Sequence, residues 1–213
     1  MSKQGSRIYI LAGYARSGKD TAGVYLVEKY GVKRWAFADK LKEAAKRLTV
    51  MIPTSPLTGA VVEVLRAAGM DAEHEPGTEN WHVPFWDGRD ETKRHPCVQL
   101  GKVMRDVVDP AIWVRAVLED EKFWTDVRNT GVVITDCRYL NEWRMVAEKA
   151  EQQYAQVEMI WLEREGTVPQ GEEAATTIHL KPLAVTVVNN GTIQELGLRI
   201  DQALGRGQLR ART

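Results

Sequence analysis

The residues whose types and spacing most clearly indicate a chemistry lie near the start of the chain, at positions 13–21, which read GYARSGKDT. Gly13 and Gly18, with Lys19 directly after, match the spacing of a phosphate-binding P-loop between a strand and a helix. Backbone N–H groups of such a loop turn toward a phosphate, the next helix points its positive end at it, and the lysine reaches the β and γ oxygens. An ordinary turn with two glycines by chance is the alternative, and a lysine in register with both glycines argues against it.

Magnesium ligands are expected next to this loop. The residue after the lysine is usually Ser or Thr, but here it is Asp20, and Thr21 follows. Either the Asp20 carboxylate or the Thr21 hydroxyl would ligate the metal, and the sequence leaves both open. Asp136 is the third candidate, because it ends an apolar run at the position where open α/β sheets bind ligands and where a carboxylate can orient Mg²⁺ through water. A helix N-cap before residue 140 is an alternative role for Asp136, and one residue can fill both.

Phosphoryl transfer needs stabilisation of negative charge more than it needs a strong base, so several cations are expected to converge on the phosphates. Besides Lys19, the candidate cations are Arg16, Lys42, Arg105, Arg138 and Arg164. The chain holds 29 lysines and arginines, so an ordinary surface position is at least as good an interpretation for each of these five. The four histidines are scattered without metal-ligand spacing.

Strands and helices alternate along the chain and must position these residues. Periodicity predicts strands at residues 7–12, 33–37, 131–136, 157–162 and 183–188. It predicts helices at residues 21–30, 39–50, 97–107, 111–126, 140–150 and 192–204. This alternation implies an α/β fold in which a mostly parallel five-stranded sheet carries helices on both faces. Together with the P-loop spacing at residues 13–21, it predicts a fold of the P-loop NTPase type.

A length of 213 residues suits a single domain over residues 1–213. Residues 53–94 hold four prolines and the aromatic residues Trp81, Phe85 and Trp86. They read as a long substrate-side insertion with a short helix near 60–68. Residues 164–181 are polar and lid-like, and residues 205–213 are expected to be a frayed tail.

The composition indicates that the binding partners are small molecules. Lys+Arg and Asp+Glu both number 29, so the formal net charge is zero and no nucleic-acid partner is expected. No apolar run of 18 residues occurs, so no membrane partner is expected. Cys97 and Cys137 have no CxxC spacing and are expected to be reduced thiols in a cytoplasmic protein. A homodimer is left open.

Five sequence blocks together resemble the phage-type deoxynucleoside monophosphate kinases, a branch of the P-loop kinases. They are GYARSGKDT (13–21), FADKLKEA (37–44), VQLGKVMRDVVDPAIWV (98–114), VITDCRYLNE (133–142) and VVNNGTIQEL (187–196). The blocks occur in the family's order, and that family shares the aspartate after the P-loop lysine. Residues 170–175 depart from the family's usual signature after the fourth strand, and residues 53–94 match it poorly.

The resemblance implies that ATP and Mg²⁺ are used to convert a deoxynucleoside 5′-monophosphate into its diphosphate, in the host cytoplasm if a phage encodes the chain. The residues it implies for ATP phosphates are Gly13, Ala15, Arg16, Ser17, Gly18, Lys19, Asp20 and Thr21. Those it implies for the acceptor are Asp39, Lys42, Gln99, Arg105, Asp109 and Trp113. It puts Asp136 and Arg138 beside the transferred phosphate, and makes Arg164 the start of a lid.

Three alternatives remain at this point. The first is a P-loop kinase for another small acceptor, of the dephospho-coenzyme A or phosphomevalonate type. The second is a protein that binds ATP without catalysis and switches a partner surface. A kinase acting on nucleic-acid ends is the third, and it would need a basic groove that the balanced charge does not indicate.

Overall fold

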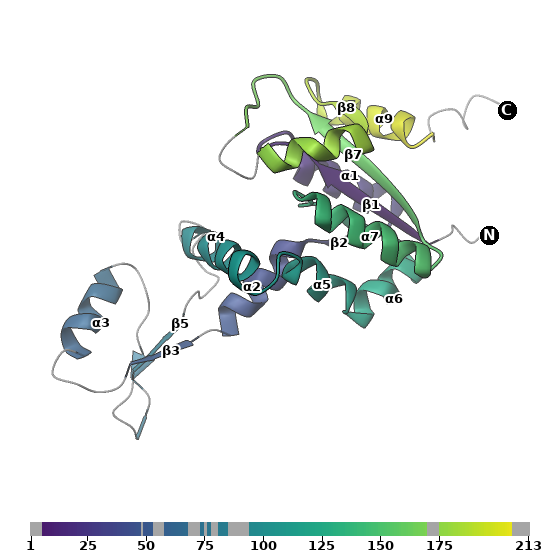
Figure 1. Ribbon diagram of the computed structural model, residues 1–213. Coiled ribbons are helices and arrows are strands. Elements are labelled where there is room, and N and C mark those ends of the chain that lie inside the picture. Colours follow the sequence, from purple (N-terminus) through teal and green to yellow (C-terminus); the bar gives the residue numbers. More distant parts are fainter. Residues whose placement is uncertain are drawn as a thin grey trace. The chain divides into compact units, whose positions relative to one another are not determined.

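The computed structural model describes residues 6–47, 49–52, 58–67, 73–74, 76–77, 81–84, 94–169 and 175–205. The chain forms two compact units, of which the first comprises Met1–Phe37 with Trp113–Thr213 and the second comprises Ala38–Ile112. Figure 1 labels most of their helices and strands. Within the described residues, no helix is long and apolar enough to cross a membrane.

A five-stranded sheet in the order β2-β6-β1-β7-β8 organises the first unit. Its strands are β1 (Arg7–Ala12), β2 (Lys33–Trp35), β6 (Val132–Ile134), β7 (Gln156–Glu163) and β8 (Val185–Val188). Every neighbouring pair runs parallel. The predicted α/β class with a mostly parallel five-stranded sheet is therefore confirmed. The first strand of the chain is central, flanked by β6 on one side and β7 on the other.

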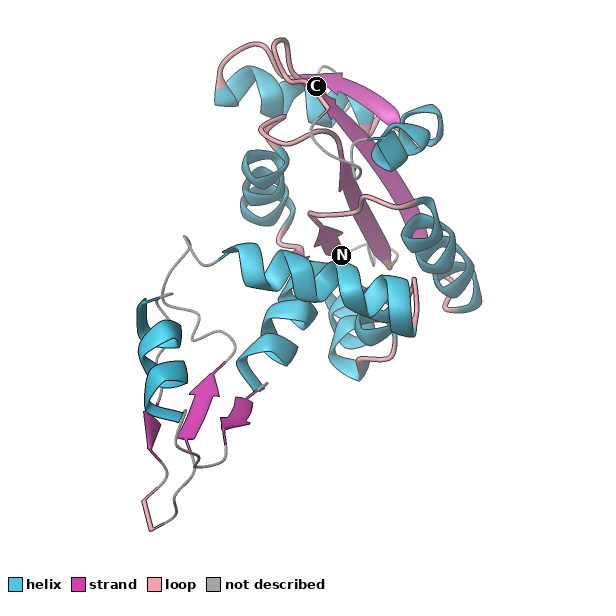
Figure 2. Cartoon of the chain, turned by 60° about the vertical axis from the view of Figure 1, so that its left-hand side comes forward, coloured by secondary structure: helices cyan, strands magenta, loops and turns pink. Residues whose placement is uncertain are grey.

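The sheet is central because its strands are apolar on both faces. On one face, Tyr9, Leu11 and Val133 join a core cluster that also contains Leu26 of α1 (Lys19–Tyr30) and Ile200 of α9 (Ile193–Ala203). Because side chains alternate along a strand, the neighbours of these residues point to the other face. There the helices α6 (Glu121–Asn129) and α7 (Leu140–Gln152) contact β1, β6 and β7. Helices accordingly lie on both sides of the strands (Figure 2).

The helices of this unit are α1 (Lys19–Tyr30), α5 (Ile112–Leu118), α6 (Glu121–Asn129), α7 (Leu140–Gln152), the 3₁₀ segment η3 (Ile178–Leu183) and α9 (Ile193–Ala203). The single helix predicted at 111–126 is wrong, because two helices occupy that stretch. The first ends at Leu118, and Asp120 caps the second, its side chain accepting a hydrogen bond of 2.8 Å from the amide of Lys122.

The second unit contains α2 (Phe37–Arg47), which begins at the last residue of the first unit, with α3 (Thr58–Ala67), α4 (Arg94–Val103) and the π-helical segment η2 (Met104–Val108). A small antiparallel sheet lies where the sequence predicted the end of a helix and an irregular insertion. Its strands follow the order β3 (Thr49–Ile52), β5 (Trp81–Pro84), β4 (Glu73–His74). α2 and α4 pack so closely that a Cβ on Gly101 would lie 2.8 Å from Cδ2 of Leu41.

Candidate functional site

The candidate site lies at the carboxyl edge of the five-stranded sheet. The loop of residues 13–18 follows β1, and the segments that begin at Asp136, Arg164 and Asn189 come after β6, β7 and β8. Parallel strands end at the same edge, so these four segments gather there. The strand order also reverses around β1, and the crevice at such a reversal is where open α/β sheets bind ligands.

The loop after β1 needs glycine at both of its ends. Gly13 has φ 139° and Gly18 has φ 98°, and L side chains rarely adopt either conformation. A Cβ on Gly13 would also lie 2.5 Å from the carbonyl oxygen of Leu162. Arg16 takes a positive φ of 64° as well, so the chain turns sharply three times within six residues. Such turns curl the backbone so that successive N–H groups point inward.

Amide groups at the start of α1 are available to an anion. Gly18 is the N-cap and provides no side-chain cap. Among the described residues, no acceptor takes the N–H of Gly18, Lys19, Asp20 or Thr21. The Ser17 hydroxyl is buried and also has no described partner. N–H groups without acceptors, at the junction of a curled loop and the positive end of a helix, form the geometry that binds phosphate.

Lys19 reaches back over the loop. Its Nζ donates to the carbonyl oxygens of Gly13 at 2.9 Å and Tyr14 at 2.8 Å. An ammonium group carries three N–H bonds, so one is left to donate to a phosphate oxygen. Burial lowers the pKa of Lys19 below 10.5 and the charge of Arg138 lowers it further, while the carboxylates of Asp20 and Asp136 raise it in part. The four charged groups therefore interact at one place.

Asp136 is held by backbone. Its Oδ1 accepts a hydrogen bond of 2.8 Å from the amide of Phe37, the first residue of α2. The alternative role of Asp136 as N-cap of the following helix is wrong, because Tyr139 is the N-cap of α7. Glu142 closes that helix start, accepting from the amides of Arg138 at 2.8 Å and Tyr139 at 3.1 Å. The backbone of Arg138 is thus fixed, and its charge acts to lower the pKa of Lys19.

The donor set fits magnesium. Asp20 is exposed in the first turn of α1, half-buried Thr21 follows it, and the carboxylate of Asp136 acts with that of Asp20 on the charge of Lys19. Mg²⁺ is usually bound by one or two carboxylates together with substrate phosphates and water. No group of three or more His, Cys, Asp or Glu side chains that could hold a metal occurs in the described part of the chain.

The two other predicted site cations of the first unit, Arg16 and Arg164, have exposed side chains. Arg16 projects from the loop into solvent. Arg164 follows β7 and is exposed, and its carbonyl oxygen closes a turn by accepting from Thr167 Oγ1 at 2.6 Å. The predicted acceptor residue Trp113 is only 6% exposed, so it belongs to the core of this unit and presents little surface to a ligand.

The remaining predicted acceptor residues belong to the second unit. Exposed Asp39 and Lys42 are on α2, Gln99 is on α4, and Arg105 is on the π-helical segment. Asp109 ends that segment, its amide bonding to the Met104 carbonyl at 3.1 Å and its Oδ1 accepting from the amide of Ala111 at 2.9 Å. Because α2 packs on α4 at Gly101, these residues come from two adjoining helices.

One residue of the site was not predicted. Asn189, directly after β8, is 9% exposed and donates from Nδ2 to the carbonyl oxygen of Ser17 at 2.9 Å. The signal available in the sequence was a pair of asparagines immediately after the last strand, at the edge where ligands bind. Nothing local in the sequence names Ser17 as the partner, because 172 positions separate the two residues.

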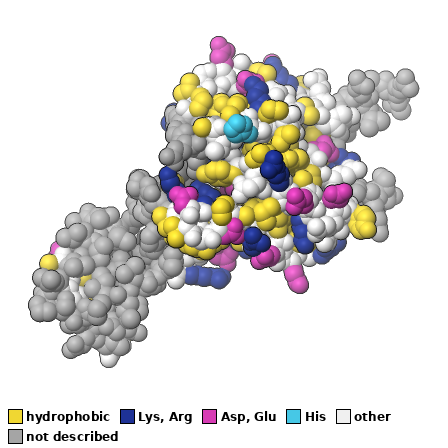
Figure 3. Space-filling model, viewed as in Figure 1, with side chains coloured by type: hydrophobic (Ala, Val, Ile, Leu, Met, Phe, Trp, Pro, Cys, Tyr) yellow, Lys and Arg dark blue, Asp and Glu magenta, His cyan; other side chains and the backbone are white. Residues whose placement is uncertain are grey.

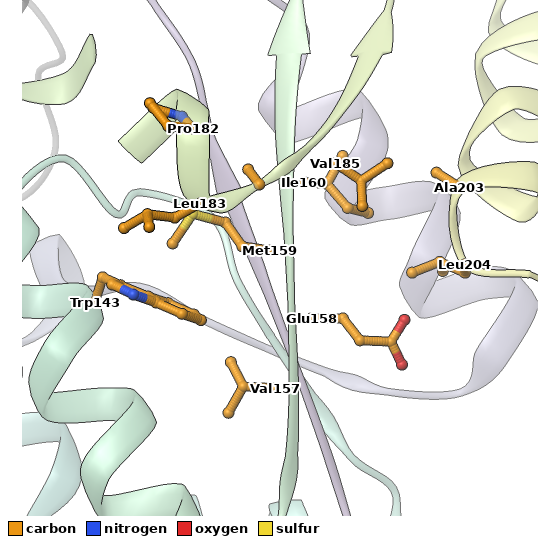
Figure 4. A pocket seen from close by; sticks show the side chains of 11 residues that line it. Trp143, Val157, Glu158, Met159, Ile160, Pro182, Leu183, Val185, Ala203 and Leu204 are labelled. Atoms are coloured by element: carbon orange, nitrogen blue, oxygen red, sulfur yellow. The ribbon is translucent and has the colours of Figure 1, made fainter. Parts of the chain in front are cut away.

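A pocket of about 390 Å³ has a lining that includes no residue of the loop (Figure 4). It is lined by Trp143, by residues 157–160 of β7, and by the ends of η3 and α9. Those β7 residues pair with residues 8–11 of β1, and the loop adjoins Leu162, which lies farther along β7. On the face drawn in Figure 3, acidic and basic side chains of the described residues are interspersed.

No family model matches the chain, and no curated protein matches it. Among solved structures, a sugar kinase from Janibacter sp. HTCC2649 has a TM-score of 0.45 and 14% identity over 98% of this chain and 99% of its own. A gluconokinase from Sinorhizobium meliloti 1021 has a TM-score of 0.43 and 13% identity over 97% of this chain and 94% of its own. A Mycobacterium tuberculosis APS kinase has a TM-score of 0.37 and 10% identity over 94% of this chain and 97% of its own. Such distant likenesses transfer no function, which has to come from the site itself.

Proposed function

We propose that this protein is an ATP- and Mg²⁺-dependent phosphotransferase whose acceptor is a deoxynucleoside 5′-monophosphate. The observation that carries the phosphate-binding part is the curled loop of residues 13–18. The amides of residues 18–21, where this loop meets α1, have no acceptor among the described residues, and Lys19 lies over the loop with one N–H left to donate. Asp136 and Arg138 act on the same lysine.

These residues would stabilise charge and align the reactants. The attacking oxygen of a nucleoside monophosphate is already anionic, so transfer of the γ-phosphoryl group requires no general base. Lys19 and Arg138 would balance negative charge that spreads over the transferred group and the leaving diphosphate. Loop amides would hold the β-phosphate, which fixes the direction of an in-line displacement.

Mg²⁺ would be held by Asp20 or Thr21 and by Asp136, and when bound it neutralises charge between the β- and γ-phosphates. Asp136 would contribute from a fixed position, because the amide of Phe37 already orients its carboxylate. Asp20 and Thr21 share the first turn of α1, so either can face a cation beside the phosphates.

The acceptor assignment rests on the resemblance to deoxynucleoside monophosphate kinases. What supports it is a pair of adjoining helices, α2 and α4–η2, with two cations and two acids among Asp39, Lys42, Arg105 and Asp109. Arg105 lies in a π-helical turn, a feature frequent at functional sites. Kinases for other phosphorylated small acceptors share this chemistry, so substrate choice is the part that experiment must decide.

The test is a panel of acceptors assayed with ATP–Mg²⁺ by coupled detection of ADP. It includes all deoxynucleoside and ribonucleoside monophosphates, dephospho-coenzyme A and phosphomevalonate. Turnover with at least one deoxynucleoside monophosphate, well above the rate of ATP hydrolysis alone, is expected. Turnover confined to a non-nucleotide acceptor would overturn the substrate assignment. Stoichiometric ATP binding without turnover of any acceptor would instead favour the binding or switch protein.

A further inference from the structure

Asn189 holds the part of the phosphate loop that immediately precedes helix α1. Its Nδ2 donates to the carbonyl oxygen of Ser17 at 2.9 Å, and the side chain is almost fully buried. The backbone of Asn189 is fixed in turn, because its amide donates to the carbonyl oxygen of Glu163 at 2.7 Å. That bond extends the ladder in which Glu163 pairs with Val188. The donor is therefore carried by the sheet and not by a mobile loop.

This bond sets the direction of the next amide. No peptide bond among the described residues is cis, and in a trans peptide the C=O and the N–H point to opposite sides. When Asn189 draws the carbonyl of Ser17 toward β8, the N–H of Gly18 must point away from β8. That N–H has no described acceptor, so it is one of the groups that a phosphate can use.

The fit between Asn189 and the loop also explains the second glycine. A Cβ on residue 18 would lie 2.2 Å from Nδ2 of Asn189, which no real pair of atoms tolerates. Gly18 has φ 98° besides. Hence close approach of the amide and a left-handed backbone both demand glycine at this position.

We infer that Asn189 is a positioning residue for ATP, which orients the N–H of Gly18 toward the phosphates by binding the carbonyl oxygen of Ser17; this role rests on the proposed function. An amide side chain suits the task and a carboxylate does not. An aspartate here would face the Ser17 carbonyl with an acceptor and no donor, and it would add negative charge beside the triphosphate.

The test compares Asn189→Asp and Asn189→Ala with Asn190→Ala. Asn190 is a matched control because its Oδ1 accepts from the amide of Glu165 at 2.8 Å, outside the phosphate loop. ATP affinity is measured by titration calorimetry, KM for ATP and for the acceptor by steady-state kinetics, and folding by thermal melts. If one variant at position 189 does not fold, the other still provides the comparison.

The expected loss of ATP affinity is about tenfold for Asn189→Ala and larger for Asn189→Asp, as the loss of one oriented hydrogen bond to a charged group predicts. KM for ATP should rise in step while KM for the acceptor stays within about twofold, a split that general loosening of the fold would not produce. Unchanged ATP affinity in a folded Asn189→Asp variant would overturn this role alone. A wild-type chain that binds no ATP would overturn the proposed function and this role with it.

Discussion

The Oδ1 atom of Asp136 lies 2.8 Å from the amide nitrogen of Phe37, from which it accepts a hydrogen bond. This bond joins the end of β6 to the first residue of α2, across 99 positions of sequence. A backbone donor rather than a flexible side chain therefore orients the carboxylate. The negative charge is held where it raises the pKa of Lys19, against the lowering effects of burial and Arg138.

Replacing this carboxylate by an amide should impair transfer more than folding. In Asp136→Asn the side-chain oxygen can still accept from Phe37, so the local structure is kept while the charge that would serve Mg²⁺ is removed. We expect kcat to fall about a hundredfold, the usual scale for losing one electrostatic group at a transition state, and the Mg²⁺ concentration needed for half-maximal rate to rise.

Glu148→Gln is the matched control for this charge removal, since Glu148 is exposed on α7. Steady-state rates across a Mg²⁺ titration, with thermal melts of both variants, make the comparison. A folded Asp136→Asn variant with wild-type kcat and wild-type Mg²⁺ dependence would exclude the carboxylate from the reaction.

ATP binding should weaken at alkaline pH because Lys19 must carry its proton to attract phosphate. Its pKa is lowered, chiefly by burial and then by Arg138, so the proton leaves at a lower pH than from an ordinary lysine. Arg138→Gln removes a charge that lowers this pKa, and the alkaline loss of affinity should move to higher pH. Asp136→Asn removes a charge that raises it, and the loss should move to lower pH.

Calorimetric titrations of ATP between about pH 7.5 and 10 measure these midpoints, a range that brackets a lysine pKa below its ordinary value. The direction of the shift is the readout, because both variants also change the affinity at neutral pH. Midpoints that coincide in the wild type and in both variants would show that Lys19 does not sense these neighbours.

A second polar cluster is expected to contribute to the stability of the fold and not to ATP binding. Asp201 of α9 is 7% exposed and accepts hydrogen bonds from Lys29, Tyr25 and Tyr30 of α1. Burial acts to raise the pKa of Asp201, but the bonds from Lys29, Tyr30 and Tyr25 outweigh it and the pKa is lowered. Burial and the bond to Asp201 raise the pKa of Tyr30 to about 12. The cluster joins the two helices at the end of α1 remote from Lys19.

Asp201→Asn is expected to lower the free energy of unfolding by about 2 kcal/mol at neutral pH, because it weakens a nearly buried set of charge-assisted bonds. A carboxylate with a lowered folded-state pKa stabilises the fold above its unfolded pKa, and this contribution is lost as pH falls through the folded value. The difference between wild type and variant should therefore shrink in acid, below the ordinary value of 3.8. Urea unfolding at several pH values measures this difference in the free energy of unfolding, with Gln202→Ala, at an exposed position, as the control. A difference that stays constant as the pH falls into the acid range would contradict the proposed link between stability and the protonation of Asp201.

The sequence predicted the parallel sheet because its strands are short apolar runs with little ambiguity. Residues 7–12 are a strand with the predicted bounds, since nearly every side chain in that run is apolar and is buried between helices on both faces. The phosphate-binding motif at residues 13–21 could be located for a similar reason. Its glycines and lysine act through adjacent backbone groups, so the relevant spacing is local.

Longer-range features were missed where local patterns compete. The apolar periodicity at 111–126 continues across Asp120, which hid the helix break that its side chain creates. The small sheet of the second unit contains Thr49–Ile52, a β-branched run that the helix predicted at 39–50 partly absorbed. Asn189 could not be connected to Ser17 at all, because only the closed sheet brings them together. Residues 170–174 and most of the tail at 205–213 lie outside the described residues.

The affinity of the loop for a triphosphate is measured most directly by titrating ATP–Mg²⁺ into the wild type and into the variants Lys19→Ala and Lys33→Ala. Lys33 is the matched lysine because it is exposed at the first residue of β2, at the amino edge of the sheet. We predict one ATP per chain for the wild type, the same affinity within about twofold for Lys33→Ala, and a loss of about a hundredfold for Lys19→Ala with its fold intact. If a folded Lys19→Ala variant bound ATP as tightly as the wild type, or if the wild type bound no ATP, the assignment of this loop as a triphosphate site would be contradicted.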